Sequence, residues 1–161
     1  MSVLVGIDID RAFAVQAAPS EVFRVLTDVP ESASHFPKLQ RLVDLGNSVY
    51  RWEMEKMGLG PFSLQTVYAS RYVWNRAKRT VAWTPVEGEG NALVSGSWKI
   101  SPNAGSPRRK STRLVLRILG QIELSLPRLM QGVAAPLVRL EFESLVGQYV
   151  ANLTGRFGGA A

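Results

Sequence analysis

The sequence predicts an α+β fold, in which a curved antiparallel sheet of six or seven strands wraps around a long C-terminal helix. Residues 39–119 alternate apolar and polar side chains with the period of two that is typical of strands. Residues 136–156 instead repeat apolar side chains with the 3.6-residue period of a helix, and two short helices are expected after the first strand. With 161 residues, the chain is expected to form one domain over residues 1–161.

The N-terminal part predicts a strand followed by two short helices. Residues 7–15 alternate with period two, which indicates a half-buried strand. A helix is expected to begin within residues 17–21, because Pro19 suits a first helical turn, where its missing N–H would lack a partner anyway. A second helix is expected over residues 31–36, and it contains the only histidine, His35.

The middle of the chain predicts successive antiparallel strands joined by glycine-rich turns. In residues 48–56, Tyr50, Trp52 and Met54 alternate with charged residues, so one face should meet an apolar interior and the other water. The other strands are expected at residues 7–15, 39–45, 62–74, 80–84, 92–101 and 112–119. Residues 102–111 predict an exposed loop that carries Arg108, Arg109 and Lys110.

The C-terminal helix is expected over residues 136–156, beginning at Pro136. At 21 residues it would span about 30 Å, enough to cross the sheet and close its concave side. Its apolar stripe consists of Val138, Phe142, Leu145, Val146, Tyr149 and Leu153. Large rings lining a concave sheet opposite such a helix favour a ligand cavity between them, with core packing as the alternative interpretation.

Composition and charge restrict the possible functions. The chain has no cysteine, which excludes disulfides and a cysteine nucleophile, and no segment resembles a signal peptide or a spanning helix, so a cytoplasmic protein is expected. The net charge is +6, and residues 71–117 contain ten Lys or Arg against two Glu. We expect these cations to solvate an outer sheet face or to give a weak contact with an anionic membrane, and nucleic-acid binding is not expected.

Catalytic and cofactor motifs give no strong signal. Any histidine-based mechanism must use His35, whose setting is more typical of a surface or capping residue. The paired glycines at Gly58/Gly60 and Gly88/Gly90 predict hairpin turns rather than phosphate-binding loops. We therefore predict no catalytic residue, no metal site and no cofactor.

Several segments resemble the START/SRPBCC superfamily, whose members have the helix-grip fold. Residues 17–28 look like the family's first helix, residues 81–83 and 96–98 like its central hairpin, and residues 111–116 like the strand after its variable loop. The terminal helix completes the resemblance, which is nearest to the bacterial polyketide cyclase/dehydrase and lipid-transport group. It implies a helix-grip ligand-binding domain without a fixed set of catalytic residues.

Three hypotheses of function remain open. The first is a protein that binds or carries a hydrophobic small molecule or lipid; the second is a cyclase/dehydrase-like enzyme that acts by positioning its substrate; the third is a basic interaction module with a vestigial cavity. Whether any reaction is catalysed is undecided, although binding alone is favoured, and the oligomeric state is open. The aromatic residues expected on the inner face also include Tyr72. The predicted ligand contacts are Tyr50, Trp52, Met54, Tyr68, Trp83, Trp98, Leu116, Phe142, Val146 and Tyr149.

Overall fold

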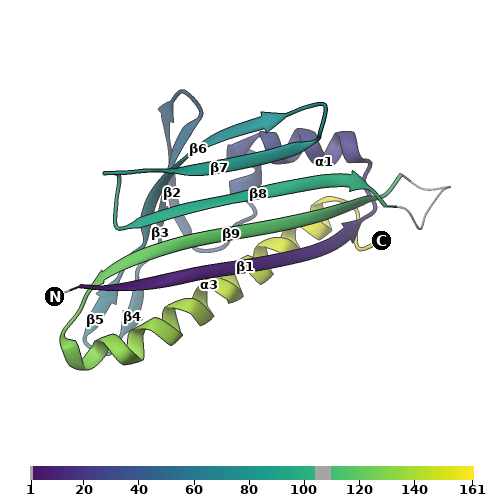
Figure 1. Ribbon diagram of the computed structural model, residues 1–161. Coiled ribbons are helices and arrows are strands. Elements are labelled where there is room, and N and C mark those ends of the chain that lie inside the picture. The colour runs from purple at the N-terminus through teal and green to yellow at the C-terminus, as the bar shows by residue number, and fades with distance from the viewer. Residues whose placement is uncertain (1, 104–109) are drawn as a thin grey trace.

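A seven-stranded antiparallel sheet curves around one long helix (Figure 1). The computed structural model describes residues 2–103 and 110–161. The strand order is β1-β9-β8-β7-β6-β3-β2. These strands are β1 (Ser2–Val15), β2 (Leu39–Gly46), β3 (Val49–Met54), β6 (Val67–Asn75), β7 (Thr80–Val86), β8 (Ala92–Pro102) and β9 (Thr112–Ser125). The predicted α+β class and curved antiparallel sheet are confirmed.

A small second sheet and two short helices lie near opposite ends of the main sheet (Figure 1). Strands β4 (Met57–Leu59) and β5 (Phe62–Leu64) form a hairpin beside the start of the long helix. Helices α1 (Pro19–Thr27) and α2 (Val29–Ala33) follow β1. The Asp28 side chain accepts a hydrogen bond from the Glu31 backbone N–H and so caps α2.

The long helix α3 (Arg128–Arg156) crosses the concave side of the sheet (Figure 1). Its buried residues are Ala134, Val138, Leu145, Val146, Tyr149 and Leu153. These side chains pack with the inward-facing residues of the strands into one hydrophobic core. The helix thus closes the concave side of the sheet, as the apolar stripe predicted.

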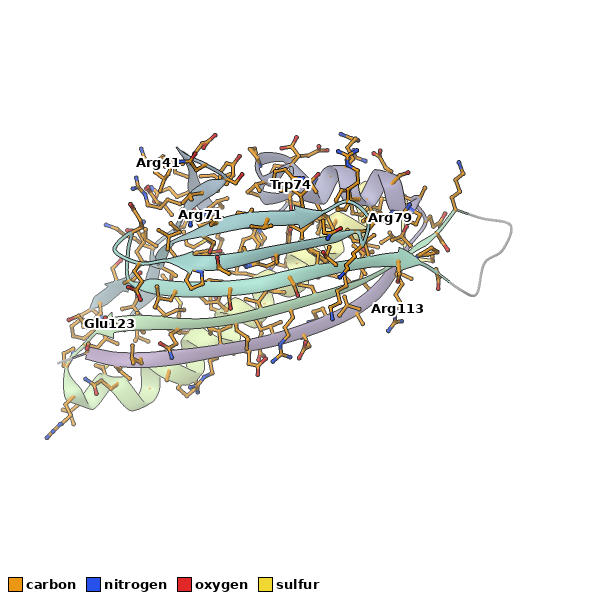
Figure 2. The ribbon with its side chains drawn as sticks, turned by 45° about the horizontal axis from the view of Figure 1, so that its top comes forward. Arg41, Arg71, Trp74, Arg79, Arg113 and Glu123 are labelled. Carbon is orange, nitrogen blue, oxygen red and sulfur yellow. The ribbon has the colours of Figure 1, made fainter. Side chains whose placement is uncertain are left out.

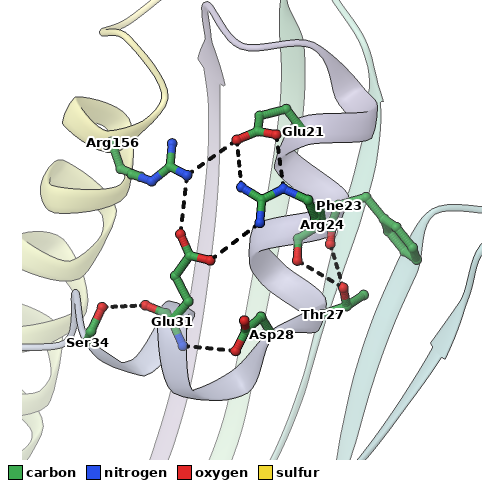
Figure 3. Close-up of polar contacts among 8 residues, drawn as sticks. All are labelled: Glu21, Phe23, Arg24, Thr27, Asp28, Glu31, Ser34 and Arg156. Atoms are coloured by element: carbon green, nitrogen blue, oxygen red, sulfur yellow. Dashed lines mark hydrogen bonds and ion pairs between the residues drawn. The ribbon is translucent and has the colours of Figure 1, made fainter.

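Ion pairs connect the C-terminal end of α3 with α1 and α2 (Figure 3). The Arg156 guanidinium lies 3.3 Å from a Glu21 carboxylate oxygen and 3.2 Å from one of Glu31. Arg24 also pairs with Glu21, at 2.9 Å, and this bond holds the pKa of Glu21 below its usual value. The cluster fixes the two short helices against the end of α3, although exposed pairs of this kind contribute little each.

The predicted strand over residues 62–74 is interrupted, and this boundary was wrong. β5 ends at Leu64 and β6 begins at Val67. The Asn91 side chain accepts a hydrogen bond from the Val67 backbone N–H at 2.8 Å and donates one to the Gln65 carbonyl at 2.9 Å. An amide from a distant turn therefore satisfies the backbone where the strand is broken.

Other elements also differ from their predicted bounds. β1 begins at Ser2 rather than at residue 7, and the second helix spans Val29–Ala33 rather than 31–36, so that His35 lies in the turn after it. β9 continues past Leu119 to Ser125, because Ile122 and Leu124 resume the inward-facing alternation after Gly120. α3 begins at Arg128 rather than at Pro136, so the proline lies inside the helix on its exposed side. Ala134 and Val138 are buried on either side of Pro136, so the helix packs against the core both before and after the proline.

Candidate functional site

The main internal cavity lies between the inner face of the sheet, the α2 region and α3. Its volume, measured as room for the centre of a water molecule, is about 60 Å³. That is more than the roughly 10–15 Å³ that one water needs on this measure. The lining residues are Ile7, Leu26, Val29, Ser32, Phe36, Trp52, Tyr68, Tyr72, Trp83, Val94, Trp98, Leu116, Ile118, Gly120, Ile122, Phe142, Val146 and Tyr149.

Aromatic rings from four strands, from α3 and from the turn after α2 line this cavity. Trp52 of β3 stacks on Tyr68 of β6, with ring centroids 5.9 Å apart. On the opposite side, Phe36 lies 5.1 Å from Tyr149 of α3 and 5.6 Å from Trp52. Such offset and edge-on pairs stabilise buried rings beyond their area alone. The rings therefore give the cavity a well-defined aromatic wall.

Gly96 in β8 makes room for one of these rings. A Cβ atom at this position would lie 2.4 Å from the Trp83 ring and 2.5 Å from the Arg117 carbonyl oxygen. Both approaches are closer than packed atoms tolerate. The absence of a side chain at Gly96 thus allows the Trp83 indole to lie against β8, opposite α3.

Hydroxyl and indole groups provide the polar atoms of the cavity. The Ser32 and Tyr149 hydroxyls lie 2.5 Å apart, and the Trp52 indole N–H donates to the Tyr72 hydroxyl at 3.1 Å. Tyr68 also lines this cavity. A polar ligand atom could pair with its hydroxyl.

Burial raises the pKa values of the cavity tyrosines further above neutral pH. It raises the pKa of Tyr149 to about 12, even though the Ser32 hydroxyl counteracts the increase. It also raises the pKa values of Tyr68 and Tyr72 far above the usual value, again mainly by desolvation. These groups can donate a hydrogen bond to a ligand carbonyl, but they cannot act as bases near neutral pH.

Charged groups are absent from this cavity as far as the described residues show: none of its lining residues is Asp, Glu, Lys, Arg or His. His35 takes no part in the lining, and its carbonyl accepts a hydrogen bond from Asn152 at 2.9 Å. Across the same described segments, no cluster of three metal-ligating side chains occurs. The arrangement can hold and orient a largely apolar molecule.

A second pocket of about 210 Å³ adjoins the main cavity. It lies between α3 and the β4–β5 hairpin, and Phe142 lines both spaces. Lys38 and Glu141 form an ion pair of 3.0 Å at this pocket, with side chains that are 58% and 30% exposed. The outer pocket is therefore the more polar of the two.

The predicted ligand contacts fall into three places. Trp52, Tyr68, Trp83, Trp98, Leu116, Phe142, Val146 and Tyr149 line the main cavity. Met54 lies at the outer pocket instead. Tyr50 lies at a surface hollow beside Leu39 and Leu42. The structure brings most of the predicted set together, and whether these residues contact a ligand stays a prediction.

Sequence reasoning missed part of the lining. Tyr72 could have been included, because the alternation of β6 already places it on the inner face with Tyr68. Ser32 and Phe36 gave no comparable signal, since they belong to a short helix and the turn after it. Their position depends on how α2 packs against α3, which no local pattern reveals.

The basic residues of the stretch 71–117 do not point into the cavity. Figure 2 shows Arg71, Arg79 and Arg113 projecting from the sheet on the side away from α3. Arg117 pairs with Asp8 and Asp10 on the same outer face. Arg108 and Arg109 of the predicted basic loop lie outside the described residues. The described cations thus belong to the outer face, apart from the site.

Comparisons with known proteins identify the fold through structure rather than sequence. No family model matches the chain, and a search of curated proteins finds no match. A START superfamily protein from Mycobacterium smegmatis superposes with a TM-score of 0.67 at 14% identity, covering 94% of this chain and 97% of that one. The Zhui aromatase/cyclase from Streptomyces sp. R1128 gives 0.58 at 18% identity, covering 93% and 90%.

A plant protein gives a similar result. Norcoclaurine synthase from Thalictrum flavum superposes with a TM-score of 0.58 at 12% identity, and 96% of this chain and 97% of that chain are covered. Together these likenesses show that the chain has the helix-grip fold, as its motifs predicted. At such low identities they establish the fold alone, because this fold carries many functions.

Proposed function

We propose that the protein binds a hydrophobic small molecule or lipid in the cavity between the sheet and α3, and carries the molecule while it is bound there. The aromatic lining supports this proposal most directly, because Trp52, Trp98 and Tyr149 supply large apolar surfaces with isolated polar atoms. Ligand sites commonly combine an apolar wall with a few polar groups that orient the ligand. The Tyr68 and Tyr149 hydroxyls are the orienting groups in this proposal.

Binding of a ligand requires the cavity to enlarge. The present volume of about 60 Å³ is small beside the roughly 300–1,000 Å³ typical of ligand pockets. Phe142 is the residue whose movement would join the inner cavity to the outer pocket, since it lines both. The exposed Lys38–Glu141 pair would oppose this opening only weakly.

A cyclase-like enzyme is the second candidate. The likeness to the Zhui aromatase/cyclase favours it, together with tyrosine hydroxyls that stay protonated and can hold a substrate carbonyl. Such an enzyme would act mainly by keeping a flexible substrate in a reactive conformation. In that case, Tyr149→Phe should slow product formation from an aromatic polyketide precursor while ligand affinity changes little.

Tryptophan fluorescence tests the binding proposal. Three of the four tryptophans line the cavity, whereas Trp74 is 44% exposed and lies outside it. We expect a long-chain fatty acid, a quinone or an aromatic polyketide to change the emission of the wild-type protein. The Trp74→Phe variant should keep the response, because the reporting rings are those of the cavity.

A matched pair of variants on α3 tests whether the change in tryptophan emission comes from a ligand bound in the cavity. Val146 is 1% exposed and lines the cavity, whereas Val133 is 52% exposed on the same helix. Val146→Phe should fill the cavity and abolish the response, and Val133→Phe should retain it. The unfolding free energy of Val146→Phe should stay within about 1–3 kcal/mol of the wild type, depending on how well the cavity adapts. Equal responses in both variants would exclude this cavity as the site.

A further inference from the structure

Exposed apolar side chains gather on one face of the N-terminal half of α3. Leu129, Val133 and Leu137 follow one another at intervals of four residues, and Leu140 comes three residues later. This spacing places them on one helical face. Their exposed fractions are 91%, 52%, 38% and 63%, respectively. We call this set the outer stripe; it lies opposite the buried Ala134 and Val138.

The outer stripe is not explained by the packing of the domain. Single exposed apolar residues are common, but a contiguous group on one element indicates a contact surface. Farther along α3, the same outward face carries Glu143, Ser144, Gly147 and Gln148, all of them exposed. The second half of α3 therefore forms a helix without apolar residues on its outward face. The outer stripe of the first half accordingly indicates a contact with a partner outside the domain.

The charges around the stripe indicate the chemistry of that partner. Within residues 124–140, Arg128 and Arg139 are the only charged side chains, and both are exposed. Two carboxylates follow directly: Glu141, which pairs with Lys38 at 3.0 Å, and Glu143. The arginines are eleven residues apart, about three helical turns, and so lie on the same flank of the stripe. The Arg139 side chain is fixed against the sheet edge by a 2.9 Å hydrogen bond to the Gly6 carbonyl. Over its own length the apolar strip is thus bordered by cations, a pattern found in helices that lie on anionic bilayers.

A second copy of this chain fits the stripe less well. Pairing two stripes would bring Arg128 and Arg139 of both copies to the border of the contact, and Glu141, the carboxylate next to the stripe, is already paired with Lys38. The net charge of +6 also opposes self-association. No helix in the described segments is long and apolar enough to cross a membrane.

We propose that the N-terminal half of α3 docks the protein on an anionic lipid bilayer. Leu129, Val133, Leu137 and Leu140 enter the headgroup region, and the flanking arginines contact lipid phosphates. The docking argument depends on this surface alone. Its use in ligand exchange rests on the proposed function, since Val138, Glu141 and Phe142 of the neighbouring helical face line the outer pocket.

Vesicle co-sedimentation of the full chain tests this proposal. Vesicles of phosphatidylglycerol and phosphatidylcholine in equal parts should bind the wild-type protein, and pure phosphatidylcholine should bind it much less. The triple variant Leu129→Ser/Val133→Ser/Leu140→Ser should lose about tenfold or more in binding. The control Val73→Ser/Leu119→Ser removes exposed apolar residues from the sheet and should bind as the wild type does. Arg128→Gln should weaken binding and reduce its dependence on salt.

Other outcomes separate the alternatives. Unchanged vesicle binding by the triple variant, with an unchanged melting temperature, would overturn the proposal, as would a wild-type protein that ignores anionic vesicles. A wild-type dimer that the triple variant converts to monomers would show that a second copy covers the stripe instead.

Ligand uptake from detergent-free solution is measured in parallel. Uptake without vesicle binding refutes only the docking, and vesicle binding without uptake refutes only the carrier function.

Discussion

The two halves of α3 present similar apolar side chains to the sheet but different side chains to the outside. On the buried side, Ala134 and Val138 of the first half are continued by Val146 and Leu153 of the second. On the outer side, leucines and a valine give way to small and polar residues after Leu140. The apolar residues on the buried side are needed for the helix to pack against the sheet. The apolar residues on the outer side are not, and their restriction to the N-terminal half indicates a function of that half.

The ends of the helix also differ in how they are fixed. The C-terminal end is tied to α1 and α2 by the ion pairs of Arg156 (Figure 3). The hydrogen bond between Ser32 and Tyr149 adds a second connection to α2. The N-terminal half adjoins the outer pocket and the β4–β5 hairpin. We therefore expect the C-terminal half to anchor the helix, and the N-terminal half to be the side on which a ligand enters.

A pair of leucine variants should give the largest difference between the two halves. Leu153 is fully buried, and Leu129 is 91% exposed. Leu153→Ala should lower the unfolding free energy by about 2–5 kcal/mol, because it removes core contacts and leaves a cavity. Leu129→Ala should change it by about 0.5 kcal/mol or less. Urea unfolding measures both, and a comparable loss in the two variants would mean that the outer stripe is packed.

The Ser32–Tyr149 hydrogen bond should have a smaller effect. Tyr149→Phe leaves the buried Ser32 hydroxyl without this partner, which should cost about 1–3 kcal/mol. Substitution of Ser144, an exposed residue of the same helix, by Ala should change stability little. If Tyr149→Phe unfolds at the same urea concentration as the wild type, the hydrogen bond does not anchor the helix.

The pH dependence of stability gives a further test of the same anchor. The pKa of Tyr149 is raised from 10.0 to about 12, so the unfolded chain loses its proton first as the pH rises. The contribution of this group is complete below pH 10 and is lost progressively up to about pH 12. Tyr149→Phe should show a shallower loss over this interval, whereas identical pH profiles for variant and wild type would contradict the buried position of the hydroxyl.

The exposed ion pairs at Arg156 should have the smallest effect. Arg156→Gln removes the contacts with Glu21 and Glu31 and should cost about 1 kcal/mol or less, since partly exposed pairs are screened by solvent. The loss should shrink further in high salt. A salt-independent loss of several kcal/mol in thermal or urea unfolding would mean that these pairs do more than hold the short helices in place.

The sequence was sufficient for the architecture and for eight of the eighteen residues that line the cavity. Alternation in β3 and β8 placed Trp52 and Trp98 on the inner face, and the helical period placed Val146 and Tyr149 opposite them. The break between β5 and β6 could not be predicted, because it depends on hydrogen bonds from the distant Asn91 side chain. Ser32 was missed for a similar reason, since its partner Tyr149 lies far away in the sequence.

The outer stripe was missed because the predicted helix began too late. Starting the helix at Pro136 left Leu129 and Val133 outside it, so that only Leu137 and Leu140 remained and no stripe could be recognised. Proline usually ends or begins a helix, but α3 continues through Pro136, with Ala134 and Val138 buried on either side of it. Whether a helix continues through a proline in this way is decided by the three-dimensional packing.

Native mass spectrometry of the purified protein, after incubation with a total lipid extract, tests the central claim most directly. The account predicts a fraction of the wild-type protein with one bound apolar molecule, which organic solvent extracts. It also predicts that this fraction is absent from Val146→Phe and retained by Val133→Phe. Wild-type protein that stays at its own mass throughout, with no apolar compound bound at any concentration tried, would contradict the assignment of the cavity as a ligand site.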